Sequence, residues 1–333
     1  MSSTEMPDNV QISVRGLSKI FPIKQKGWRT PDRLLHAVDD VSFDILKGET
    51  FGLVGESGSG KSTVARLLLR AYTLSAGQVL FRRKDGSVAD ITALDDKQMR
   101  PLRSEMQMIF QDPYSSLNPR MTIRDLIGEP MQLNGYSAQD IRTRVAELLT
   151  EVGLRPEYAT RYPHAFSGGQ RQRICIARAL AMNPSFIAAD EAVSALDVSV
   201  AAQNINLLQD MQDKFDLTYL FITHDLGMVE HISDRIAVMY LGRIVEMGST
   251  EELFAKPRHP YTEALLSAVP QPDPRKRSRE KRGVLKGEIP DASNPPTGCA
   301  FHPRCPYATA LCSEKRPTQR EVFGRQVSCH HAE

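Results

Sequence analysis

One segment of the chain has the composition and spacing of a phosphate-binding loop. It reads Gly55-Glu56-Ser57-Gly58-Ser59-Gly60-Lys61-Ser62 and fits the pattern G-x-x-x-x-G-K-[ST]. Glycines let successive backbone N–H groups turn inward around a phosphate, and the positive end of the following helix would point at the same anion. Lys61 is expected to reach the β- and γ-phosphates of a nucleotide and Ser62 to bind Mg²⁺. The residues predicted to contact nucleotide here are Gly55, Ser57, Gly58, Gly60, Lys61, Ser62 and Thr63.

An acidic pair follows an apolar run farther along the chain. Residues 186–189 predict a buried strand that ends at Asp190 and Glu191. Asp190 is placed to hold Mg²⁺, often through water, and Glu191 is placed to polarise the attacking water as a general base. Two acidic residues after a strand could merely cap a helix. Together with the phosphate-binding loop, they indicate nucleotide hydrolysis.

The elements that must position these residues alternate between short apolar runs and helical patterns. Apolar runs of this length are typical of buried parallel strands, and their alternation with helices predicts an α/β core with a parallel sheet. We expect strands over 12–15, 41–45, 51–54, 106–110, 186–189, 219–223 and 236–239, and helices over 63–72, 138–152 and 168–182.

Composition places the chain among globular proteins of about two domains. Of its 333 residues, 41% are hydrophobic and 25% charged, and the net charge of +2 gives no reason to expect a nucleic-acid partner. No stretch approaches the roughly 20 apolar residues that span a bilayer, and residues 1–14 lack the basic-then-apolar order of a signal peptide. We therefore expect a cytosolic protein that reaches a membrane through partners.

A second anion-binding motif separates this chain from other proteins with a phosphate-binding loop. It reads Phe166-Ser167-Gly168-Gly169-Gln170-Arg171-Gln172-Arg173. Ser167 is a good N-cap, and the two glycines expose backbone N–H groups at the positive end of the helix. The string resembles the signature of the ABC ATPase family. The resemblance implies that Ser167, Gly169 and Gln170 bind the γ-phosphate of ATP held by a partner subunit, so that ATP joins two subunits and hydrolysis releases them.

Further positions match the same family. The resemblance makes Gln111 a glutamine that senses Mg²⁺ and water, and His224 a histidine that contacts the γ-phosphate beside Glu191. Residues 194–197 match the D-loop, which links the two sites of the dimer. Phe21 is the candidate for stacking on adenine, although a core position would suit a phenylalanine nearly as well. Ala192 departs from the family pattern, which has proline after the catalytic glutamate, and this puts the pose of Glu191 in doubt.

Other segments resemble the branch of the family that imports oligopeptides and dipeptides. These are residues 111–120, 197–200 and 259–262, together with the cysteine-rich end. The resemblance implies a second ATPase subunit, related or identical, two membrane permeases and an extracytoplasmic binding protein, with this chain peripheral on the cytoplasmic face of the inner membrane. In that branch the surface near residues 112–120 receives a helix of the permease, for which Tyr114 and Leu117 offer apolar anchors. Sugars, nickel or other small solutes are alternative cargoes, and a soluble ABC ATPase acting on nucleic acid or ribosomes is an alternative function.

The resemblance also predicts how the chain is divided. Residues 1–255 would form the ABC ATPase domain, with parallel and antiparallel β-structure and a helical subdomain at about 112–178, and residues 256–333 a C-terminal extension. Prolines near residues 257–274 predict little regular structure there. The basic run at 275–282 is either a solvated linker or a contact for anionic lipid headgroups.

Four cysteines crowd the C-terminal end with the spacing C-x5-C-x6-C-x16-C. In a reducing cytosol such a group suggests a metal site rather than disulfides. Zinc sites usually contain C-x2-C pairs, which are missing here, and four thiolates also suit a [4Fe–4S] cluster. Related importer ATPases carry such a cluster, which favours iron and sulfur, with zinc or free thiols as alternatives. The predicted ligands are Cys299, Cys305, Cys312 and Cys329.

Overall fold

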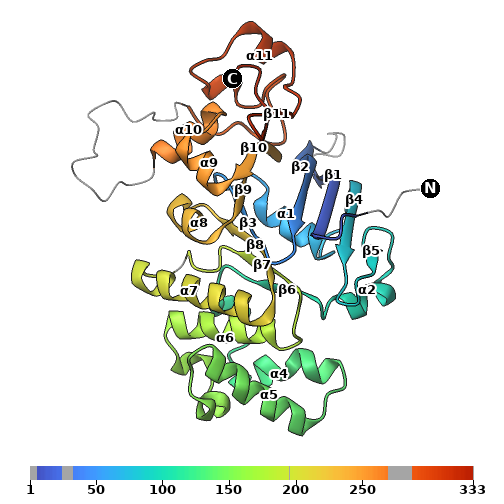
Figure 1. Ribbon diagram of the computed structural model, residues 1–333, viewed down its shortest axis with the longest axis vertical. Coiled ribbons are helices and arrows are strands. Elements are labelled where there is room, and N and C mark those ends of the chain that lie inside the picture. Colours follow the sequence, from blue (N-terminus) through green and yellow to red (C-terminus); the bar gives the residue numbers. More distant parts are fainter. Residues whose placement is uncertain (1–5, 25–32, 195, 269–286, 333) are drawn as a thin grey trace. The chain divides into compact units, whose positions relative to one another are not determined.

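The computed structural model describes residues 6–24, 33–194, 196–268 and 287–332 (Figure 1). The chain divides into two compact units, and each is described by itself. Unit 1 contains the described parts of Met1–Ile12, Asp44–Thr50 and Leu80–Ile222. Unit 2 contains the described parts of Ser13–Phe43, Phe51–Val79 and Thr223–Glu333. The basic run at 275–282 lies outside the described residues.

Three parallel strands form the centre of unit 1. β7 (Phe186–Asp190) pairs with β6 (Met106–Ile109) on one side and with β8 (Thr218–Thr223) on the other. Every residue of β7 and β8 is buried, which confirms the prediction that these apolar runs are internal parallel strands. The parallel register brings the C-terminal ends of all three strands to one edge, where polar residues follow them.

Helices pack together in the rest of unit 1. α6 (Gly168–Leu180) contacts α4 (Ile123–Leu133), α5 (Ala138–Glu151) and α7 (Val198–Phe215), and Figure 1 shows these four helices side by side. The predicted apolar face of α5 is confirmed, because Val145, Leu148 and Leu149 are buried. Unit 1 also contains β5 (Val88–Asp90), and this strand pairs with the end of β4 (Ala76–Arg82). Its remaining elements are α2 (Asp96–Leu102), α3 (Pro113–Ser116) and short 3₁₀ helices at Pro156–Thr160 and Pro163–Ala165.

Unit 2 is built on β9 (Arg235–Tyr240). β9 pairs in parallel with β3 (Thr50–Val54) and antiparallel with β10 (Arg243–Ser249), and β10 pairs with the C-terminal strand β12 (Arg325–Val327). A last strand, β11 (Arg320–Val322), pairs with β12. In a separate sheet β1 (Val10–Ile23) lies between β2 (Arg33–Leu46) and β4 (Ala76–Arg82). The predicted mixture of parallel and antiparallel strands is therefore observed.

Short helices complete unit 2. α1 begins directly after the glycine-rich segment, and the other helices follow β8 and β10 along the chain. They are α1 (Lys61–Leu68), α8 (Leu226–Ile232), α9 (Thr250–Ala255), α10 (Pro260–Ser267), a 3₁₀ helix at His302–Arg304 and α11 (Ala310–Glu314). In the described residues, no helix is both long enough and apolar enough to cross a membrane.

Two predictions about these elements were wrong in part. The first helix was expected to run to Tyr72 but ends at Leu68, because Arg70 adopts a left-handed backbone conformation with φ of 53°. The prolines after residue 256 were expected to remove regular structure, yet Pro260 starts α10. Proline at the first helical position loses no intrahelical hydrogen bond, and the His259 side chain caps the helix by accepting from the Tyr261 N–H.

Candidate functional site

The phosphate-binding loop predicted from the sequence joins β3 to α1 in unit 2. Two of its glycines are required by the close approach of other backbone. A Cβ at Gly55 would lie 2.1 Å from the carbonyl oxygen of Met239, and one at Gly60 would lie 2.2 Å from that of Ala37. A Cβ at Gly58 would meet no atom within 4 Å, although φ is +79° there. The loop is thus packed on one side and open at Gly58, as a cradle for an anion must be.

Lys61 crosses this loop from the first turn of α1. Its Nζ donates to the carbonyl oxygens of Gly55 at 2.7 Å and Glu56 at 2.9 Å, and its side chain is buried. The amine is therefore held inside the curve of the loop, where the phosphates of a nucleotide would lie. Ser62 and Thr63 occupy the same helical turn and are half-buried.

A neighbouring residue ties this loop to the C-terminal part of unit 2. The Glu56 carboxylate accepts two hydrogen bonds from Arg304, and the Glu56 N–H donates to the hydroxyl of Tyr261 at 2.9 Å. These contacts were not predicted from the sequence, because Glu56 fills a variable position of the motif and its partners lie far away along the chain.

The predicted acidic pair stands at the end of β7 in unit 1. Asp190 is buried at 4% exposure, and Glu191 adopts a left-handed conformation with φ of 48°. The Glu191 N–H donates to the Ile222 carbonyl of β8 at 2.8 Å, and its carbonyl accepts from the Ser194 N–H and hydroxyl. Ala192, where the family has proline, is buried in this turn. These bonds hold the backbone of Glu191 in place with alanine at position 192.

The structure brings Gln111 to this acidic pair. Gln111 follows β6, which pairs with β7, so the two side chains emerge from neighbouring strand ends. The Gln111 Nε2 donates to the Glu191 Oε2 at 2.6 Å. The amide and the carboxylate thus lie side by side at this edge, from which both can contact the same water molecule.

The signature segment is an N-capped helix, as predicted. The Ser167 hydroxyl accepts from the Gln170 N–H at 3.3 Å, and the Ser167 N–H donates to the Gln170 side-chain oxygen at 3.1 Å. This capping box holds the start of α6 at the surface, where Ser167 is exposed. A Cβ at Gly169 would lie 2.4 Å from Val200 Cγ1 of α7, so glycine is needed here for helix packing as well. Ala195 of the predicted D-loop lies outside the described residues.

The predicted permease anchors differ in exposure. Asp112 caps the short helix α3, and hydrogen bonds from Tyr114 and Ser115 lower the pKa of its carboxyl group. Tyr114 is 61% exposed, with the Arg171 guanidinium 4.2 Å from its ring centre. Leu117 is 2% exposed and belongs to the core, so the expectation that it offers a surface anchor was wrong.

Two predicted residues lie in unit 2 outside the loop. His224 is exposed between β8 and α8, and Asp225 beside it caps α8. Phe21 is half-buried on β1, with its ring centre 5.5 Å from that of Tyr72 and 4.9 Å from the Lys19 ammonium. The Phe21 ring is thus partly accessible for stacking on a base, which a ring enclosed in the core would not be.

The four C-terminal cysteines lie near one another in unit 2. Burial, together with a smaller effect of the other three cysteines, raises the pKa of the Cys299 thiol to about 11. The Cys312 Sγ lies 3.4 Å from the His331 Nε2. Within residues 6–24, 33–194, 196–268 and 287–332, however, no group of three or more His, Cys, Asp or Glu residues is arranged to hold a metal ion. The described residues therefore show no preformed metal site, and metal binding by the four cysteines stays a prediction.

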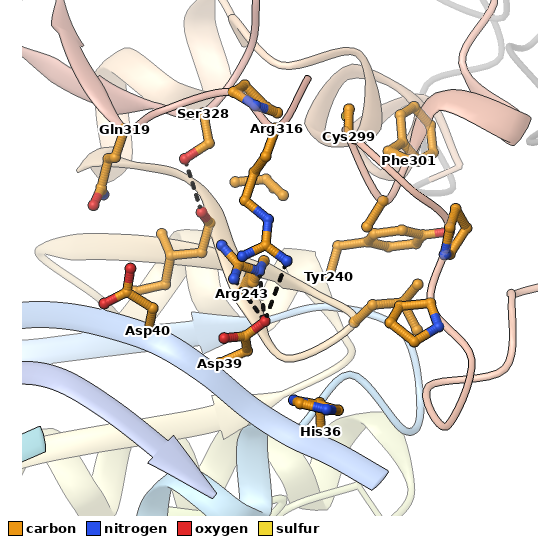
Figure 2. A pocket seen from close by; sticks show the side chains of 18 of the residues that line it. His36, Asp39, Asp40, Tyr240, Arg243, Cys299, Phe301, Arg316, Gln319 and Ser328 are labelled. Carbon is orange, nitrogen blue, oxygen red and sulfur yellow. Dashed lines mark hydrogen bonds and ion pairs between the residues drawn. The ribbon is translucent and has the colours of Figure 1, made fainter. Parts of the chain in front are cut away.

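A cavity of about 470 Å³ lies beside Cys299 in unit 2 (Figure 2). Its wall includes Tyr240 and Phe301, and Asp39 accepts ion pairs there from Arg243 at 2.6 Å and from Arg316 at 3.5 Å. Arg243, Arg316 and Asp39 thus form one cluster of charged side chains on the wall of this cavity.

Comparison with known proteins places these features in a family. A profile of the ABC transporter family matches residues 38–194, and a profile of the C-terminal region of oligopeptide/dipeptide transporters matches residues 245–312. The oligopeptide transport ATP-binding protein AppF of Bacillus subtilis is 50% identical over 322 residues, which cover 96% of each chain. A putative peptide import ATP-binding protein of Brucella ovis is 51% identical over 318 residues, which cover 95% of this chain and 96% of the relative.

Solved structures of ABC cassettes share the fold. The post-hydrolysis dimer of the cassette MJ0796, bound to ADP and phosphate, is similar with a TM-score of 0.62 and 26% identity over 72% of this chain and 98% of the cassette. The cbiO1 subunit of an ABC transporter from Clostridium perfringens is similar with a TM-score of 0.62 and 27% identity over 74% of this chain and 92% of that subunit. The fold is thus that of the ATP-binding cassette with mixed α/β sheets.

Proposed function

Because this chain belongs to the family of ABC transporter ATP-binding proteins, we propose that it hydrolyses ATP to drive the import of oligopeptides or dipeptides across the cytoplasmic membrane. The observation that carries the proposal is the presence of two anion-binding helix starts, at Lys61 and at Ser167, in one chain that also matches the C-terminal region of oligopeptide/dipeptide transporters. Its relatives are named for oligopeptide transport and peptide import.

Each proposed role follows from a side chain and its contacts. The loop N–H groups and Lys61 bind the phosphates, since the amine already lies inside the loop. Glu191 takes the proton of the attacking water, and Gln111, bonded to Glu191, orients that water. His224 contacts the γ-phosphate, and Phe21 stacks on the adenine. Ser62, Asp190 and Gln111 offer the hydroxyl, carboxylate and amide oxygens that suit Mg²⁺, which would neutralise charge on the phosphates when bound.

The signature helix acts on a second subunit in this proposal. Ser167, Gly169 and Gln170 would contact the ATP held by a partner, which is a related ATPase chain or a second copy of this one. Two membrane permeases and an extracytoplasmic binding protein would complete the importer, and the chain would sit peripherally on the cytoplasmic face of the inner membrane. Residues 1–255 would form the ATPase domain and residues 256–333 its extension.

Turnover of ATP by the purified chain tests the enzymatic part. Glu191→Gln keeps the shape of the side chain but cannot accept a proton, so phosphate release should fall by about 10²–10⁴-fold while ATP still binds. The exposed Glu147→Gln on α5 is the matched control and should leave the rate unchanged. Equal and negligible rates in the wild type and Glu191→Gln would instead indicate a regulator with little turnover.

Vesicles that contain the chain with its co-purified permeases test the cargo. ATP should drive uptake of a labelled dipeptide, and Glu191→Gln should abolish that uptake. Uptake of a sugar or nickel with no uptake of peptide would assign another solute. Co-purification with nucleic acid or ribosomes in place of permeases would support the soluble alternative.

We also propose that the four cysteines of the extension bind a [4Fe–4S] cluster, with zinc as the alternative. Support comes from the ligand type and from the closeness of two of the cysteines, since the Cys299 N–H donates to the Cys312 carbonyl oxygen at 2.7 Å. Burial raises the pKa of the Cys299, Cys305 and Cys329 thiols, so metal binding would release protons, and the ligands would have to rearrange around the metal. Chain purified without oxygen should be brown and carry about four irons, and Cys312→Ser should remove them. Colourless chain with zinc would favour zinc, and chain with neither metal would favour free thiols.

A further inference from the structure

Glu56 carries a negative charge within the proposed phosphate-binding loop, and this charge would repel a triphosphate bound there. In this chain its charge is matched by Arg304. The Arg304 guanidinium donates to one Glu56 carboxylate oxygen at 2.7 Å and to the other at 3.0 Å. The Arg304 side chain is 5% exposed and that of Glu56 is 24% exposed, so water screens this pair only in part.

All the polar groups of Glu56 are engaged, and two of its partners come from the C-terminal part of unit 2. The carboxylate binds Arg304, and the N–H donates to the Tyr261 hydroxyl at 2.9 Å. The Glu56 carbonyl oxygen accepts from the Lys61 Nζ at 2.9 Å. A continuous chain of contacts therefore runs from Arg304 through Glu56 to the Lys61 amine, which is proposed to bind the phosphates.

Arg304 itself is buried beside a cluster of aromatic rings. Its guanidinium lies 3.4 Å from the Tyr240 hydroxyl and 5.8 Å from the centre of that ring. Tyr240, Tyr261 and Phe301 pack against one another with ring centres 4.7 to 5.4 Å apart, and each is at most 1% exposed. The Arg304 N–H donates to the Phe301 carbonyl oxygen at 3.0 Å. Figure 2 shows Tyr240 and Phe301 together on the wall of the neighbouring cavity.

We propose that Arg304 is a positioning residue for ATP: it neutralises Glu56 and fixes the loop that holds Lys61, so that the C-terminal segment completes the nucleotide site. This proposal rests on the proposed binding of ATP by the Gly55–Ser62 loop. It gives the segment after residue 256 a part in nucleotide binding, in addition to the metal binding proposed for its cysteines.

The test compares MgATP binding by full-length variants. In Arg304→Ala, Glu56 would be left unpaired beside the phosphates, so the Kd for MgATP and the KM should rise about tenfold or more, while kcat changes little. Adding Glu56→Gln to Arg304→Ala removes the repelling charge and should recover a large part of that loss. Arg304→Lys keeps the charge but not the two-pronged geometry, and should raise the Kd less than Arg304→Ala.

Arg316→Ala is the matched control, because it removes another arginine of the same segment that pairs with an acid, Asp39 (Figure 2). It should leave the Kd unchanged. Lys61→Ala separates this proposal from the proposed function: if it binds MgATP as well as the wild type, the assignment of the loop itself fails. If Lys61→Ala loses binding while folded Arg304→Ala and Arg304→Lys bind like the wild type, the role of Arg304 is overturned. It is also overturned if Arg304→Ala weakens binding and Glu56→Gln restores none of it, since Arg304 would then act on the fold alone.

Discussion

His259 is a buried, neutral histidine at the start of α10. Its backbone N–H donates to the Glu246 carboxylate at 2.9 Å, and its Nδ1 accepts from the Tyr261 N–H at 3.1 Å. Burial lowers the pKa of the ring from 6.5 to about 3. The Tyr261 hydroxyl in turn accepts a hydrogen bond from the Glu56 N–H. His259 therefore supports the part of unit 2 that contacts the phosphate-binding loop.

Acid should destabilise the protein through His259. The unfolded chain takes up a proton below a pKa of 6.5, whereas the folded chain does so only near 3, so the unfolded state binds more protons in between and stability falls as the pH falls. Between pH 7.5 and 5.5 this should remove about 1.4 kcal/mol from the free energy of unfolding. Urea unfolding of the wild type and His259→Asn at both pH values measures it. An asparagine can still cap α10 but does not titrate, so an equal loss in both proteins would contradict the prediction.

Most residues of the candidate site were predictable from sequence because each motif is local. Lys61, Asp190 and Ser167 stand beside the strand or helix start that their motifs require, and the structure places them there. The bond from Gln111 to Glu191 follows from the parallel register of two predicted strands. The pair of Glu56 and Arg304, by contrast, joins residues 248 positions apart, and no local pattern signals such a contact.

At the scale of elements, the start of α6 is constrained by its neighbour α7. A Cβ at Gly169 would lie 2.4 Å from Val200 Cγ1, whereas a Cβ at Gly168 would meet Leu196 Cδ2 at an ordinary 3.6 Å. The same segment that exposes N–H groups to a phosphate therefore depends on glycine for close helix packing. The motif alone does not reveal that helix packing also requires a glycine at position 169.

Gly169→Ala should therefore destabilise the protein by about 1–3 kcal/mol, because the added methyl group must push the two helices apart. Gly168→Ala is the matched control and should be neutral or slightly stabilising, since alanine favours a helix over glycine. Removing the Val200 Cγ atoms makes room, so the double variant Gly169→Ala and Val200→Ala should recover a large part of the loss. Thermal or urea unfolding of the four proteins measures this, and equal stability of the two alanine variants would refute it.

Elements were predicted well where burial determined them and less well where a single residue decided the boundary. The buried strands β7 and β8 appear almost as their apolar runs predict. The end of α1 depends on the backbone angle of Arg70, and the start of α10 depends on a histidine cap. Neither feature leaves a periodic pattern, so apolar spacing alone could not reveal it.

At the scale of the whole molecule, the two anion-binding helix starts belong to different units. The loop with Lys61 is in unit 2, and the helix start with Ser167 is in unit 1. The proposed sandwich requires each ATP to contact the first loop of one chain and the second of another. The loop with Lys61 and the helix start with Ser167 are then both necessary for hydrolysis, although the loop makes most of the contacts with ATP.

Ser167→Arg should accordingly abolish hydrolysis while leaving the binding of MgATP to the isolated chain nearly unchanged, because the large cation blocks the surface that the partner's nucleotide must reach. Ser167→Arg also removes the N-cap of α6, which costs about 1 kcal/mol of stability. Ser137→Arg removes the N-cap of α5 at a similar cost, so it is the matched control and should keep the wild-type rate of hydrolysis. Where the chain pairs with itself, mixing Ser167→Arg with Lys61→Ala should restore about a quarter of the wild-type rate, since half of the dimers are mixed and each of those has one intact composite site. Phosphate release and equilibrium binding of a fluorescent ATP analogue measure the two effects. A wild-type rate in Ser167→Arg would show that the signature helix does not touch the reacting nucleotide, and the sandwich would have to be abandoned.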